Sequence, residues 1–235
     1  MNLEKIIPKD GPSIEEVERY VKKYSNELIV IKCGGSVLLD ENLFNQFIED
    51  ISVINKLGLS AIVVHGGGKN IKKKLDQHNI ESKFINGLRV TNEKTIKIVE
   101  EALLELNTEI LNNIKDKEAN AQSVTPKNEN IIKIIPEKKE LGFVGTPKEI
   151  NKEVLLSIVR EKKVPIIVPL GIGDDRKIYN INADVVAAAI AKEINARRLI
   201  LMTDVEGVLD KDKKLISEIN SETANNMIND QSISG

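Results

Sequence analysis

Two short apolar runs that close on glycines constrain the fold of this chain more than any other feature. Residues 28–32 read LIVIK and are followed by the glycine pair 34–35, and residues 60–65 read SAIVVH and are followed by the glycine triplet 66–68. Short runs rich in β-branched residues and bounded by turn residues predict buried strands. Because a helical pattern follows each turn, the sequence predicts a mostly parallel sheet covered by helices on both faces.

The rest of the chain continues this alternation of strands and helices. The periodicity predicts helices at 13–24, 43–58, 69–80, 95–114, 149–162 and 183–194, strands at 164–171 and 198–207, and short strands that form a hairpin within 119–139. No internal repeat and no low-complexity linker interrupts the pattern. We therefore expect one α/β domain with two lobes.

Composition limits the classes of function. Apolar residues make up 41% of the 235 residues and charged residues 30%, with a net charge of -2, which is typical of a soluble globular protein and argues against dedicated nucleic-acid binding. No window approaches the ~20 apolar residues of a membrane span. The single cysteine, Cys33, excludes an internal disulfide, and no Cys/His cluster has zinc-ligand spacing. A reducing cytoplasm is the expected location.

Lys32 stands where the first predicted strand meets its glycines. The carboxyl ends of parallel strands share one edge of a sheet, so both glycine turns can face the same crevice. Glycine lets backbone N–H groups approach an oxyanion, and a following helix adds its positive N-terminal end. A lysine at a buried strand end reaches water or meets a fixed anion, and beside two glycines the anion is favoured. The alternative is that the glycines merely close tight turns.

Two further stretches carry polar side chains suited to binding. Arg89, in NGLRVT, can bind a carboxylate with two parallel hydrogen bonds, although a surface ion pair is an alternative. Asn180, Asn182 and Asp184 stand where a turn enters a helix of small residues. Helix capping explains one of these three residues but not all of them.

Seven motifs together carry a family resemblance. In chain order they are VIKCGGSVL, VVHGGG, FINGLRVT, GFVG, VPIIVPLG, YNINADVVAAAIA and LILMTDVEGVL. Over residues 28–235 the chain resembles the amino acid kinase family and, within it, the N-acetylglutamate kinases of arginine biosynthesis. The resemblance implies a three-layer αβα sandwich, with an N-terminal extension at 1–25 and a kinase domain at 26–235. Within that domain, 26–170 would mainly bind acetylglutamate and 171–235 would begin the nucleotide-binding lobe.

The resemblance also implies a reaction and a role for each site residue. The γ-phosphoryl group of ATP, with Mg²⁺ bridging its phosphates, would pass to the γ-carboxylate of N-acetyl-L-glutamate. On the donor side, Lys32 would stabilise the transferring phosphoryl group, Gly34 and Gly35 would bind phosphate oxygens, and Asp204 would contact the nucleotide. On the acceptor side, Gly67 and Gly68 would enclose the reacting carboxylate, Arg89 would bind the α-carboxylate, and Asn180 and Asn182 would bind the substrate body. Asp184 would form ion pairs with the catalytic lysines. No general base is needed, because the attacking carboxylate is ionised near pH 7.

The chain departs from the family pattern after Gly235, where the family continues with a second catalytic lysine. We therefore expect a C-terminally truncated kinase with an incomplete sheet and little or no activity. Two alternatives stay open: a kinase for carrier-protein-linked aminoadipate or glutamate, and a catalytically dead regulatory or ligand-binding relative. The expected assembly is a homodimer, or a hexamer joined by the helix at 13–24, although that helix can instead cover its own domain. No nucleic-acid or membrane partner is expected.

Overall fold

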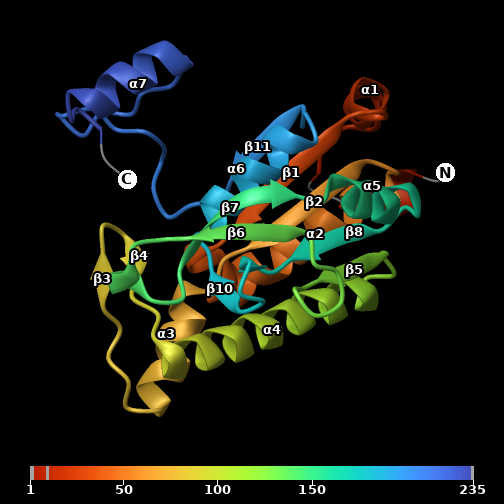
Figure 1. Ribbon diagram of the computed structural model, residues 1–235. Coiled ribbons are helices and arrows are strands. Elements are labelled where there is room, and N and C mark those ends of the chain that lie inside the picture. Colours follow the sequence, from red (N-terminus) through yellow and green to blue (C-terminus); the bar gives the residue numbers. More distant parts are fainter. Residues whose placement is uncertain (1–2, 9–10, 234–235) are drawn as a thin grey trace. The chain divides into compact units, whose positions relative to one another are not determined.

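The computed structural model describes residues 3–8 and 11–233, which form two compact units (Figure 1). The first unit extends to Met202 and contains the sheets and helices α1 to α6. The second begins at Thr203 and contains α7 (Ser221–Asn229). The lobe boundary expected near residue 170 lies inside the first unit, and the assignment of each lobe to a ligand stays a prediction.

A five-stranded parallel sheet forms the centre of the first unit. Its strand order is β11 (Arg198–Leu201), β1 (Leu28–Cys33), β2 (Ser60–His65), β8 (Val164–Ile167) and β5 (Ala121–Val124). Every neighbouring pair is parallel, which confirms the expected sheet. Cys33 pairs with His65 at the ends of β1 and β2, so the two glycine turns leave the sheet side by side.

Helices cover both faces of this sheet, as the sequence predicts (Figure 1). They are α2 (Glu41–Lys56) and α4 (Glu93–Asp116) on one face, and α5 (Lys152–Arg160) and α6 (Ala183–Glu193) on the other. Successive strand residues point to opposite faces, so Ile31 and Val63 pack with the first pair of helices and Val30 and Ile62 with the second. Each such buried side chain contributes about 1.5–3 kcal/mol of hydrophobic stabilisation.

A second, four-stranded sheet was not expected. Its order is β10 (Ile178–Asn180), β9 (Leu170–Ile172), β6 (Ile132–Pro136) and β7 (Gly145–Ile150). The prediction of one strand over 164–171 is wrong, because the chain leaves β8 at Ile167 and enters β9 in the other sheet. At Gly171 a Cβ atom would lie 2.5 Å from Cγ2 of Ile134, so β9 and β6 approach too closely for a side chain there.

The structure also corrects three other predicted boundaries. The hairpin predicted within 119–139 does not form there, because β6 pairs antiparallel with β7 while β5 joins the parallel sheet. The helix predicted from residue 149 begins at Lys152, since the preceding residues belong to β7. The last predicted strand ends at Leu201 rather than at residue 207.

The remaining elements frame the first unit. α1 (Ile14–Tyr24) begins at a capping box in which Ser13 and Glu16 each accept a hydrogen bond from the other's backbone N–H, as the sequence predicts. The others are α3 (Gly68–Gln77), β3 (Phe84–Ile85), β4 (Leu88–Arg89) and three 3₁₀ helices, η1 (Leu3–Lys5), η2 (Gly35–Leu38) and η3 (Lys139–Leu141). Over the described residues, no helix combines the length and apolar character needed to cross a membrane.

Candidate functional site

A cavity of about 240 Å³ lies at the carboxyl ends of β1 and β2. The structure gathers around it all but one of the residues singled out from the sequence: Lys32, Gly34, Gly35, Gly67, Gly68, Arg89, Asn180, Asn182 and Asp184. The exception is Asp204, which belongs to the second unit. The other nine residues thus lie around one cavity. The roles that the family resemblance implies for them and for Asp204 stay predictions.

Lys32 and Asp184 form an ion pair at the cavity. Lys32 Nζ lies 3.1 Å from Asp184 Oδ1, and the side chains are 13% and 50% exposed. Asp184 is placed by the start of α6, where the Asn182 side chain caps the helix and accepts hydrogen bonds from the N–H groups of Asp184 and Val185. Capping therefore accounts for Asn182 and the ion pair for Asp184, while Asn180 reaches the cavity from the end of β10.

At both glycine turns a side chain would meet a neighbouring residue, so glycine there does more than close a tight turn. A Cβ atom at Gly34 would lie 3.0 Å from Nζ of Lys32 and would press on the ammonium group. A Cβ atom at Gly67 would lie 2.6 Å from Cδ2 of Leu103, on α4. At Gly68, the first residue of α3, an added Cβ atom would meet nothing within 4 Å, so that position is open.

Neighbouring glycines therefore offer a matched pair of substitutions. We expect Gly67→Ala to lower the free energy of unfolding by about 1–3 kcal/mol, because the buried Leu103 side chain must move. Gly68→Ala should leave stability unchanged or slightly raised, since alanine favours a helix and meets nothing. Urea denaturation measures the free energy of unfolding of both variants. An equal decrease in the two would contradict the contact between residue 67 and Leu103.

Arg89 is buried beside the cavity and is 7% exposed, so the alternative of a surface ion pair is wrong. Its Nη2 donates to the Gly68 carbonyl at 3.0 Å, its Nη1 donates to Ser82 Oγ, and its guanidinium lies 4.7 Å from the centre of the Phe84 ring. Burial lowers the pKa of Arg89, against a smaller opposite effect of Asp76. These contacts hold the guanidinium at the edge of the cavity.

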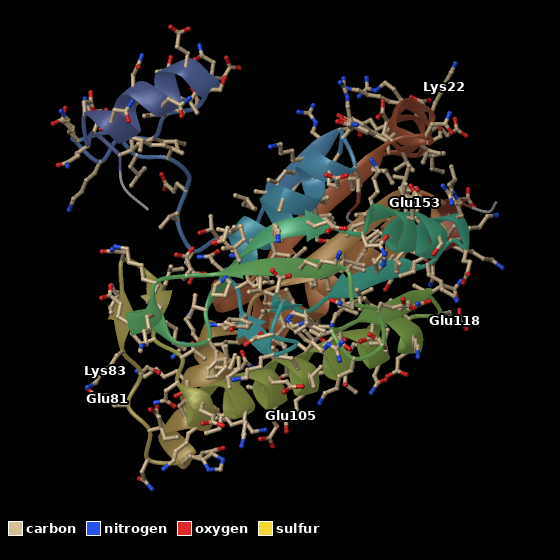
Figure 2. The ribbon with its side chains drawn as sticks, viewed as in Figure 1. Lys22, Glu81, Lys83, Glu105, Glu118 and Glu153 are labelled. Atoms are coloured by element: carbon tan, nitrogen blue, oxygen red, sulfur yellow. The ribbon has the colours of Figure 1, made fainter. Side chains whose placement is uncertain are left out.

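Ser82 and Phe84 were missed from the sequence, although they stand close before Arg89. Only the turn of two residues with positive φ, Asn86 at 48° and Gly87 at 77°, brings β3 back against β4. By contrast, Lys83 and Glu81 in the same segment are exposed and form a surface pair at 3.9 Å (Figure 2).

His65 and Asn107 form a buried polar contact that the sequence patterns also did not reveal. His65 Nδ1 lies 2.8 Å from the Gly66 carbonyl oxygen, and its Nε2 lies 3.1 Å from Asn107 Nδ2. Both side chains are at most 1% exposed. Burial lowers the pKa of His65 to about 4, despite the opposing effect of the Gly66 hydrogen bond. One asparagine within a long helical pattern carries no sequence signal for such a contact.

The lowered pKa makes stability depend on pH. The unfolded chain takes up a proton at His65 near its ordinary pKa of 6.5, whereas the folded chain does so only near 4. Between these values the unfolded state binds more protons, so His65 reduces the free energy of unfolding by about 1.4 kcal/mol per pH unit as the pH falls. Urea denaturation from pH 7 to 4 should show a steeper loss in the parent than in His65→Gln. The same substitution at the exposed His78, the other histidine of the chain, is the comparison variant.

Comparisons with known proteins show the family of the chain and its relatives. Residues 27–235 match the model of the amino acid kinase family. An acetylglutamate kinase from Pelagibacter ubique is 55% identical over 230 residues, which cover 98% of this chain and 80% of the relative. An acetylglutamate kinase from Campylobacter fetus is 41% identical over 92% of this chain and 78% of its own length.

A solved structure extends the likeness to three dimensions. The crystal structure of smu.665 from Streptococcus mutans superimposes with a TM-score of 0.79 at 30% sequence identity. The match covers 88% of this chain and 84% of that one.

Proposed function

Because the chain belongs to the amino acid kinase family, we propose that it transfers the γ-phosphoryl group of ATP to the γ-carboxylate of N-acetyl-L-glutamate. The product is N-acetyl-L-glutamyl 5-phosphate, an intermediate of arginine biosynthesis. One observation carries the chemical part of the proposal: Lys32, paired with Asp184, shares a single cavity with two glycine turns and the buried Arg89.

The reaction brings two anions together, so positioning and charge neutralisation dominate catalysis. Lys32 places a positive charge at the cavity, where it stabilises the transferring phosphoryl group, and Asp184 holds its ammonium in place. Backbone N–H groups of the turn at Gly34 and Gly35 support phosphate oxygens. The γ-carboxylate attacks without a general base, because it is already ionised.

The acceptor side is formed by the second glycine turn and the β3–β4 hairpin. Gly67 and Gly68 enclose the γ-carboxylate, while the Arg89 guanidinium binds the α-carboxylate with its remaining N–H donors. Asn180, at the end of β10, and Asn182, at the start of α6, contact the body of the substrate. These roles agree with the placement of Arg89 against Gly68, which joins the two parts of the acceptor side.

ATP is the phosphoryl donor, and we propose that Mg²⁺ arrives on its phosphates. Within the described residues, no three or more His, Cys, Asp or Glu side chains gather as a metal site. The cavity presents the Lys32 ammonium group and two glycine turns, which suit phosphate oxygens, and the one carboxylate among its described lining residues, Asp184, is paired with Lys32. Mg²⁺ would neutralise phosphate charge, and Asp204 stays a proposed contact of the nucleotide.

Substrate choice tests the proposed function. With the purified protein, a coupled ADP-release assay should respond to free N-acetyl-L-glutamate and not to carrier-linked aminoadipate or glutamate. The opposite preference would favour the carrier-linked alternative, which the acetylglutamate kinase names of the relatives do not support. ATP binding without any phosphoryl transfer would instead indicate a dead relative.

The assembly and the location are part of the same proposal. Ile14 and Tyr20 of α1 are 40% and 46% exposed, which leaves an apolar surface on that helix. We propose a homodimer, and a hexamer in which α1 joins dimers, in the cytoplasm. Sedimentation analysis of the parent and of a Tyr20→Glu variant would test the role of α1.

A further inference from the structure

A continuous series of hydrogen bonds lies behind the second glycine turn, among residues that do not line the cavity except at its end. Ser123 Oγ, on β5, donates to Asn107 Oδ1, on α4. Asn107 Nδ2 lies 3.0 Å from the Ile166 carbonyl oxygen and 3.1 Å from His65 Nε2. His65 Nδ1 then lies 2.8 Å from the Gly66 carbonyl oxygen. The series connects β5, α4, β8 and β2 to Gly66, the first residue of the turn.

The partners at its two ends determine where the protons are. A carbonyl oxygen only accepts, so the Asn107 atom beside Ile166 O must be the NH₂ group. The same NH₂ group faces His65 Nε2, which must therefore be the unprotonated ring nitrogen. At the other end, the Gly66 carbonyl requires a proton on Nδ1. Both contacts demand the same neutral Nδ1–H tautomer.

This tautomer acts on the orientation of one peptide plane. The Gly66 carbonyl and the Gly67 N–H belong to one planar trans peptide and point in opposite directions. Gly66 is also held from its other side, because its N–H donates to the Cys33 carbonyl at 2.6 Å. Gly67 lines the cavity, and within the described part of the chain its N–H has no backbone acceptor.

We infer that Asn107 is a positioning residue: by fixing His65 as the Nδ1–H tautomer, it holds the Gly66 carbonyl and directs the Gly67 N–H into the cavity. α4 supports the turn twice, because Leu103 packs against Gly67 one helical turn before Asn107. The ligand of that N–H, the γ-carboxylate, rests on the proposed function, whereas the tautomer does not.

The tautomer is measured directly in the unmodified chain. Long-range ¹H–¹⁵N correlation spectra distinguish the protonated ring nitrogen, and the chain has only two histidines to assign. The His78→Gln variant identifies the His65 signals. We expect Nδ1–H at pH 7, and an Nε2–H or doubly protonated ring would overturn the inference.

Asn107→Asp tests the effect on binding. A carboxylate cannot donate to Nε2, so the His65 ring should become the neutral Nε2–H tautomer. Its Nδ1 then has no proton to donate, and the Gly66 carbonyl should lose its fixed orientation. We expect the dissociation constant for N-acetyl-L-glutamate, measured by calorimetry, to rise about tenfold. Asn112→Asp makes the same chemical change at an exposed position of α4 and should alter neither the spectrum nor the affinity.

A second variant covers the case in which Asn107→Asp does not fold. Ser123→Ala removes the donor that holds Asn107 Oδ1 and should weaken binding about threefold. Unchanged affinity in the folded variants would overturn the inference. Failure of the unmodified chain to bind N-acetyl-L-glutamate would instead defeat the proposed function, and the wild-type spectrum would still decide the tautomer.

Discussion

Replacing Lys32 by alanine should lower turnover by on the order of 10²–10³, because the variant loses a preorganised charge beside a developing anion. Lys32 Nζ is held 3.1 Å from Asp184 and its side chain is 13% exposed, so the charge is fixed and largely shielded from water. The affinity for N-acetyl-L-glutamate should change far less. Steady-state kinetics of the parent and the variant, together with calorimetry, separates the two quantities.

Two companion variants make this prediction specific. Lys83→Ala removes a lysine that is 72% exposed and lies outside the cavity lining, so its kinetics should match the parent. Asp184→Asn keeps the ammonium but loses its ionic partner, and its loss of turnover should be smaller than that of Lys32→Ala. Equal turnover of Lys32→Ala and the parent would exclude Lys32 from the reaction.

Replacing Arg89 by glutamine should raise the KM for N-acetyl-L-glutamate about 10²-fold, with a smaller loss of kcat. A hydrogen bond to a charged group contributes about 1.5–3 kcal/mol, which corresponds to roughly ten- to hundredfold in affinity. The guanidinium is already held by Gly68, Ser82 and Phe84, so little entropy is lost when it binds a carboxylate. Steady-state kinetics measures the separation of KM from kcat.

A substrate analogue identifies which carboxylate Arg89 binds. N-acetylglutamate with its α-carboxylate converted to an amide should bind the parent as weakly as the natural substrate binds Arg89→Gln. The variant itself should hardly distinguish the two compounds, because the interacting pair is already broken. Arg160→Lys, at an arginine that is 68% exposed on α5, is the control. Additive losses from variant and analogue would place the α-carboxylate elsewhere.

Local patterns predicted the parallel sheet and most helices because their signals lie within single elements. The capping box at Ser13 and Glu16 marks the start of α1, and the long apolar period predicted α4 to within two residues at each end. The second sheet could not be predicted in this way. Its pairs, such as Lys133 with Ile172, join residues distant in sequence. At the break after Ile167 the local signal is Pro169, which the sequence pattern does not distinguish from Pro165 inside β8.

The same difference between local motifs and tertiary contacts applies to the residues of the candidate site. Lys32, the glycines, Arg89 and Asp184 lie in short motifs, and the shared edge of the sheet explains why those motifs meet. The sequence patterns did not single out Phe84, Ser82 or Asn107. These residues reach the site through a hairpin and through the packing of α4 against β2, which are tertiary contacts that no local period records.

The order of strands has a consequence for synthesis of the chain. β1 pairs with β2 on one side and with β11 on the other, where Ile29 faces Arg198. The second neighbour leaves the ribosome roughly 170 residues later, on the order of ten to thirty seconds at the usual translation rate. Throughout that interval one edge of β1 carries unpaired backbone groups, the form in which strands associate with other chains. The nascent polypeptide is therefore most exposed to self-association before Arg198 emerges.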